Sequence, residues 1–125
     1  MERQQVRERI RELTLAFFQA KLGLTPRSVE VRGGGDTLEV RVRRFFAPAE
    51  KALIDHPKER RAIEDYYLRL FDQLLPLLNA GVGKVGPIVR VQTLLDLRGN
   101  ECVFMVTLGK ESEVIIQNPA EAERE

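Results

Sequence analysis

Four arginines between positions 32 and 44 are the residues of this chain whose type and spacing best suit chemistry. They are Arg32, Arg41, Arg43 and Arg44. Strand alternation would bring most of them to one polar face of a hairpin, where planar guanidinium groups can hold a carboxylate, a phosphate or bicarbonate with two donors. The sequence therefore predicts a face that binds an acidic partner or a small anion.

Two alternatives stay open for these arginines. Glu30 and Glu39 alternate onto the same face, so the guanidinium groups could instead be neutralised within the chain. An RNA-binding module is a weaker alternative, because no aromatic residue is interleaved with the arginines to stack on bases. The net charge of +1 also gives no general attraction for nucleic acid or an anionic membrane.

The other residues whose side chains could catalyse a reaction or bind a metal are expected to have no such role. His56 is the only histidine and precedes Pro57 at a helix break, with no second ligand or acid converging on it. Cys102 lies in an apolar strand pattern, which is the opposite of a setting that stabilises a thiolate. The carboxylates on the water face of a predicted helix, beside arginines, are Glu64, Asp65 and Asp72. We therefore expect no catalytic residues, no metal site, no cofactor and no enzymatic activity.

The segment 29–42 is predicted to be a β-hairpin. Its inward-facing residues are expected to be Val29, Val31, Leu38, Val40 and Val42. The glycines at 33–35 suit a tight turn and not a phosphate loop, because a strand follows where a phosphate site needs a helix N-terminus or a lysine. An even loop predicts that Val31 lies opposite Leu38 and that Glu30 lies opposite Glu39.

Two amphipathic stretches are predicted to be helices. The first spans residues 4–22 and repeats its apolar residues at spacings of three and four. The second is interrupted at His56-Pro57, which predicts a short helix at about 48–55 and a long central helix at about 58–80. The apolar stripe of the long helix includes Leu74 and Leu77, and this helix is expected to cover a whole sheet.

Residues 88–97 and 101–108 are predicted to form a second hairpin. In its first strand, Val89 and Val91 are expected to share the apolar face. The second strand is apolar on both faces, because Val103 and Met105 alternate with the residues of its core face. A second layer, either the N-terminal helix or a second copy of the chain, must then cover Val103 and Met105. We expect a homodimer whose interface includes these two residues.

The predicted architecture is a two-layer α+β sandwich of order α-β-β-α-β-β, with an antiparallel sheet and a long central helix. With 125 residues the chain suits a single core. We expect one α+β domain over residues 1–117 and a polar C-terminal tail over 118–125, and the pattern leaves open a fifth strand at 114–116.

The expected compartment is the cytoplasm. The chain has a single cysteine and a strongly charged N-terminus unlike a signal peptide. No apolar run approaches the roughly 20 residues that cross a bilayer. We expect any membrane association to be peripheral, through a partner.

The segment that follows the first hairpin is similar to a family motif. Residues 44–53 read RFFAPAEKAL and resemble the TPAEK-type segment of the MpsC family. The glycine-rich connection and residues 89–96 and 103–108 resemble the second hairpin of that family, so the resemblance covers residues 6–109. Ala47 departs from the usual threonine, whose hydroxyl would cap the helix.

This resemblance implies an accessory role and brings no catalytic residues with it. MpsC proteins are small bacterial proteins named for a Na⁺-translocating, membrane-potential-generating system whose integral subunits are linked to inorganic-carbon uptake. We therefore expect a non-enzymatic accessory or regulatory protein that binds a membrane transporter subunit or another protein. The alternative is a sensor of bicarbonate or phosphate that uses the hairpin arginines.

Overall fold

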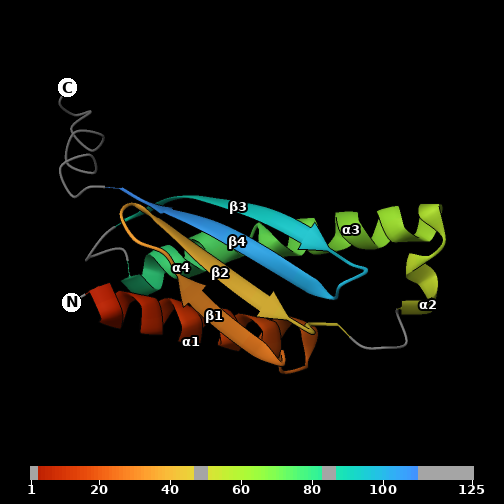
Figure 1. The fold of residues 1–125 in the computed structure, drawn as a ribbon, viewed down its shortest axis with the longest axis horizontal. Helices are drawn as coiled ribbons and strands as arrows, with labels where there is room; N and C mark the ends of the chain where they lie inside the picture. The colour runs from red at the N-terminus through yellow and green to blue at the C-terminus, as the bar shows by residue number, and fades with distance from the viewer. Residues whose placement is uncertain (1–2, 47–50, 83–86, 110–125) are drawn as a thin grey trace, which may run out of the picture.

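The computed structural model describes residues 3–46, 51–82 and 87–109, which form an α+β fold of two layers (Figure 1). Its elements are α1 (Arg3–Leu22), β1 (Ser28–Arg32), β2 (Thr37–Arg43), α2 (Lys51–Ile54), α3 (Pro57–Phe71), α4 (Leu74–Val82), β3 (Ile88–Asp96) and β4 (Glu101–Leu108). The strands make one antiparallel sheet of order β1-β2-β4-β3. The predicted class and element order are confirmed. The start of the short helix at 48, the segment 114–116 and the tail 118–125 lie outside the described residues.

Helix α1 lies on the same face of the sheet as α3 and α4 (Figure 1). It buries one side of its surface against β1 and α4, including Ile10, Phe17 and Phe18. Leu13 lies so close to Gly81 of α4 that a side chain at position 81 would collide with it. The expectation that α1 could cover the second apolar face of the last strand is therefore wrong, because α1 packs on the opposite side of the sheet.

The predicted central helix is in fact two helices. Helix α3 ends at Phe71 and α4 begins at Leu74, with Asp72 and Gln73 between them. Pro76 explains the break, because its ring would clash with the carbonyl of Asp72 in a continuous helix and it has no N–H to donate. The N–H groups of Asp72 and Gln73 instead donate to carbonyls three residues back, at 3.3 and 3.2 Å, which tightens the last turn of α3.

The break separates two leucines that a continuous helix would place on one stripe. Leu74 is completely buried under the sheet, as predicted. Leu77 is 37% exposed and lines an open groove between α1 and α4, so its predicted place in the core is wrong.

The first hairpin has the predicted strands with a different register. Val31 lies opposite Val40, and Glu30 lies opposite Arg41, which is two residues away from the predicted pairing with Glu39. A shift by two keeps every apolar side chain on the inner face, because side chains alternate with a period of two. It also places Arg41, and not Glu39, opposite Glu30, so the repulsion expected between two opposed glutamates does not arise.

A β-bulge changes the start of β3. The register against β4 shifts between Ile88 and Arg90. Ile88 is therefore buried in the core, whereas Val89, which was predicted to face inward, is largely exposed. From Val91 onward the predicted alternation holds.

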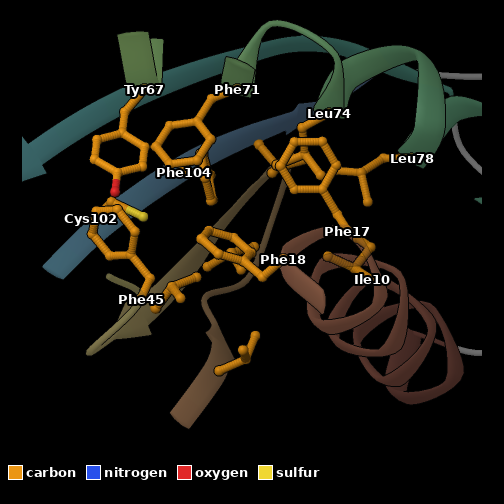
Figure 2. Packing of buried hydrophobic residues seen from close by; sticks show 14 of the residues in the cluster. Ile10, Phe17, Phe18, Phe45, Tyr67, Phe71, Leu74, Leu78, Cys102 and Phe104 are labelled. Carbon is orange, nitrogen blue, oxygen red and sulfur yellow. The ribbon is translucent and has the colours of Figure 1, made fainter. Parts of the chain in front are cut away.

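The core contains a cluster of aromatic rings between the sheet and the helices. Phe18 of α1 lies against Phe45, Phe71 and Phe104, with ring centroids 5.6 to 6.3 Å apart (Figure 2). Phe104 meets Phe71 edge to face at 5.1 Å. Rings at such distances stabilise beyond the area they bury. The cluster packs against the side of β4 that faces the helices. The side chains that alternate with Phe104 therefore point to the opposite side of the sheet.

Candidate functional site

The outer face of the sheet is the side away from the helices, and it carries the residues that the sequence singled out. Its central members, taken strand by strand, are Glu30 and Arg32 of β1, Glu39, Arg41 and Arg43 of β2, Glu101, Val103 and Met105 of β4, and Gln92 and Leu94 of β3. No helix in the described part of the chain lies over this face (Figure 1). The four-stranded sheet therefore presents a broad, open surface.

Arg41 lies at the centre of the charged half of this face. Its guanidinium donates a hydrogen bond to the Glu101 carboxylate of β4. It also forms an ion pair with Glu39, whose Oε2 lies 3.4 Å from Arg41 Nη2. The hydrogen bond to Glu101 is the largest of the causes that raise the pKa of Arg41 above its ordinary value. Arg41 is thus held by two carboxylates, one from its own strand and one from the neighbouring strand.

Arg43 and Arg32 extend this arrangement toward β1. Arg43 lies 3.8 Å from a Glu101 oxygen and 3.7 Å from Glu30 Oε1, and Arg32 lies 3.7 Å from the same Glu30 oxygen. We call the three arginines and the three glutamates Glu30, Glu39 and Glu101 the arginine–glutamate ladder. The prediction that Arg32, Arg41 and Arg43 share one face is confirmed by this geometry, and each of them contacts carboxylates of its own chain.

Arg44 does not belong to the ladder. It follows the end of β2 with a φ of +55°, and its backbone N–H donates to the Asn100 carbonyl at 2.7 Å. The left-handed conformation ends the alternation that keeps Arg41 and Arg43 on one side. Its expected role in binding stays a prediction.

Val103 and Met105 lie on the outer face in the middle of β4. Val103 is flanked by Arg41 on one side and Leu94 on the other, and Met105 by Glu39 and Gln92. Only 9% of Val103 is exposed, because the longer side chains of its neighbours cover it. The second apolar face is therefore a narrow strip inside a polar surface, and its expected role in a dimer stays a prediction.

The residues that the sequence analysis considered for catalysis or metal binding and set aside lie away from this face. Cys102 is buried in the core, where desolvation first and the nearby Glu101 charge second raise the pKa of its thiol. His56 is exposed and occupies the N-cap position of α3 without a side-chain capping bond. Asp65 and Asp72 are exposed on the helical side.

Two further kinds of site are absent from the described part of the chain. No three side chains of histidine, cysteine, aspartate or glutamate come together there in a group that could hold a metal ion. None of the described helices has the length and apolar character that a membrane span requires.

Two features of the structure escaped sequence reasoning. Glu101 is the carboxylate that joins Arg41 to Arg43, and its position two residues before Val103 on an alternating strand is a signal that could have placed it on the outer face. The second feature is an open, largely apolar groove of about 760 Å³ between α1 and α4, lined by Phe17, Pro76 and Leu77 among others. The proline that breaks the helix was the available signal for it.

Comparison with known proteins gives one match. The family described as "MpsC: Na⁺-translocating membrane potential-generating system (MpsC)" matches residues 2–110 of the chain. No curated protein and no solved structure matches the chain.

Proposed function

The chain belongs to the MpsC family, and from that membership we propose that it is a non-enzymatic accessory protein that acts by binding a protein of a Na⁺-translocating membrane system. The process that the family resemblance suggests is inorganic-carbon uptake. In this proposal the chain works in the cytoplasm and reaches the membrane through its partner. The outer face of the sheet is the docking surface.

The observation that carries this proposal is the arginine–glutamate ladder on the outer face of the sheet, which no described helix covers. A guanidinium group has five N–H donors, and the contacts of Arg43 and Arg32 at 3.7 to 3.8 Å leave donors free for a further acceptor. Alternating charges on a sheet face favour a partner surface with complementary charges and exclude partners with the wrong pattern. This is the chemistry of a protein docking surface.

The same geometry favours a protein partner over a small anion. Bicarbonate or phosphate would have to displace Glu101 or Glu39 from Arg41, or approach Arg43 beside the Glu30 carboxylate. Like charges close together repel, so these carboxylates weaken the attraction of the ladder for a free anion. A partner surface with both signs of charge meets no such penalty.

The test compares two arginines that have similar exposure but lie in different places. Arg32 belongs to the ladder and its side chain is 73% exposed, whereas Arg98 lies in the turn between β3 and β4 and its side chain is 67% exposed. Each makes a single ion pair, at 3.7 Å, among the described residues. Reversing either charge changes the net charge equally and should leave the fold intact, since exposed pairs contribute little stability.

The experiment is affinity capture from detergent-solubilised membranes of the source cells, with the captured proteins identified by mass spectrometry. We expect the wild-type chain and Arg98→Glu to enrich the same integral membrane protein, and Arg32→Glu to bind that purified protein about tenfold more weakly. Equal binding by all three chains would move the docking surface elsewhere. An equal loss of binding in Arg32→Glu and Arg98→Glu would show that binding depends on net charge and not on the ladder. Failure of the wild-type chain to enrich any membrane protein would count against the accessory role.

A further inference from the structure

Strand β3 lies at one edge of the sheet that the described strands form. It has nine residues and pairs with β4 alone among the described strands. An edge strand presents a row of unpaired N–H and C=O groups, and proteins usually protect it with lysines, prolines or a covering segment. Residues 89–96 contain no lysine or proline, and the bulge lies only at the start of the strand. The edge also exposes apolar side chains, with Leu94 55% exposed.

The charges of β3 are complementary to those of a second, antiparallel β3. When Thr93 lies opposite Thr93 of the second copy, Arg90 lies opposite Asp96 of that copy, and Asp96 lies opposite its Arg90. Both charged residues belong to the outer face, where opposed side chains are close enough to interact. The two pairs form together, because the arrangement is symmetric.

Neighbouring registers lack this match. Only shifts by two residues keep inner side chains on the inner face. Moving the symmetry axis one residue toward Gln92 places Arg90 opposite Leu94 of the second copy. Moving it to Leu94 places Arg90 opposite Arg98. The charges therefore select the register centred on Thr93.

The inner face beneath β3 is incompletely covered at the same place. An open groove of about 520 Å³ lies between α3 and β3, lined by Asp65, Leu68, Arg69, Asp72, Val91 and Thr93. Leu68 is exposed and Val91 is only half-buried. A second copy centred on Thr93 would place Leu95 of its own β3 opposite Val91 and would bring its α3 toward Leu68.

We propose that a second copy of this chain docks edge to edge along β3, with the two-fold axis at Thr93, and joins the two sheets into one continuous antiparallel sheet. The proposal does not depend on the proposed function. It adds to it, because both outer faces then lie on one side of the joined sheet and both sets of helices on the other. Two ladders facing one way can bind a partner with two sites more tightly than either ladder alone.

A cysteine at the two-fold axis tests the geometry directly. Directly opposed residues of antiparallel strands have Cα atoms about 4.5 to 5.5 Å apart, which is within the range of a disulfide. We expect full-length Thr93→Cys to form a disulfide-linked dimer under mild oxidation. Gln92→Cys is the control, because the two copies of residue 92 would be diagonal neighbours about 7 to 8 Å apart and should link poorly. Cys102 is buried and stays in both variants.

Charge reversal tests the register. Arg90→Glu would place a glutamate opposite Asp96 of the other copy at each of the two symmetric positions. We expect this repulsion to raise the dimer dissociation constant about tenfold or more, as measured by light scattering coupled to gel filtration. Arg90→Glu combined with Asp96→Lys should restore the dimer. Asp96 also accepts a bond from Gly99 N–H at 3.0 Å, so circular dichroism must show that the double variant is folded, and Asp96→Asn, which keeps an acceptor there, should weaken the dimer only partly.

Three outcomes would overturn the proposal. The first is a wild-type chain that stays monomeric at tens of micromolar. The second is equal cross-linking of Thr93→Cys and Gln92→Cys, which would reflect random collision. The third is a dimer that Met105→Glu dissociates while Thr93→Cys fails to cross-link, because that dimer would use the outer face around Val103 and Met105.

Discussion

The side-chain amide of Asn100 pairs with the backbone of Phe46 through both of its polar groups. Its Oδ1 accepts a bond from the Phe46 N–H at 3.2 Å, and its Nδ2 donates to the Phe46 carbonyl at 3.2 Å. The same Oδ1 also accepts a bond from the Phe45 N–H at 2.9 Å. The turn after β3 thereby holds the segment that carries the chain from β2 to the helical layer, and both phenylalanines are buried there.

Removing this amide should destabilise the fold. Asn100 has a φ of +52°, so Asn100→Gly removes the side chain without adding backbone strain. We expect the free energy of unfolding to fall by about 1 to 3 kcal/mol, because buried backbone groups of Phe45 and Phe46 lose their partner. Urea unfolding measures it, with Arg98→Ala in the same turn as a nearly neutral control. Equal midpoints for the two variants would show that the amide contributes nothing.

Two leucines of α4 should respond differently to the same substitution. Leu74→Ala would open a cavity under the sheet and should cost about 2 to 5 kcal/mol. Leu77→Ala removes an exposed side chain and should cost under about 1 kcal/mol. Denaturant midpoints for the pair check the position of the helix break, since a continuous helix through Asp72 and Gln73 would bury both leucines and make the two costs similar.

The hairpin turn should tolerate a methyl group at one glycine and not at its neighbour. Gly33 has a φ of +114°, and a Cβ there would lie 2.7 Å from the Thr37 carbonyl oxygen, whereas Gly34 has open space around it. Gly33→Ala should therefore destabilise the chain by about 1 to 3 kcal/mol. Gly34→Ala should be neutral or slightly stabilising. Thermal melts of the two variants give the comparison, and a Gly33→Ala variant that melts with the wild type would contradict the turn geometry.

Cys102 should be unreactive in the folded chain. Burial raises the pKa of its thiol, so at pH 8 the thiolate that reacts with iodoacetamide is scarce as well as inaccessible. We expect alkylation followed by mass spectrometry to be slow in buffer and fast in 6 M guanidinium chloride. Since the unfolded thiol ionises near pH 8.5, its contribution to stability is complete below that pH and falls above it. Rapid alkylation of the native protein would contradict the packing of β4.

The faces of the strands could be predicted because they depend on local alternation. Val29, Val40 and Phe104 lie on the core face as their positions in the sequence require. The same periodicity placed Arg41 and Arg43 together on the outer face. What it could not supply was the partner of each arginine, since Glu101 lies sixty residues from Arg41 and comes beside it only through the pairing of β2 with β4.

The error at the central helix has a local cause. Pro76 lies within an apolar run that otherwise continues the helical period, and the clash of its ring with the Asp72 carbonyl was present in the sequence. The exposure of Leu77 follows from that break. By contrast, the placement of α1 beside α4 on one face of the sheet depends on close packing of Leu13 against Gly81, which no local pattern specifies.

The sequence by itself determined the α+β class, the order of the elements, the inner and outer sides of the strands except at the bulge that turns Val89 outward, and the family. Tertiary structure decided that Glu30 lies opposite Arg41 and not Glu39, that β3 pairs with β4 alone among the described strands, and that no described helix covers the outer face of the sheet. The physical reason is that a period of two fixes which side a residue faces but is unchanged by a shift of two residues. Register and strand order are chosen only when distant segments meet, by charge and packing between them.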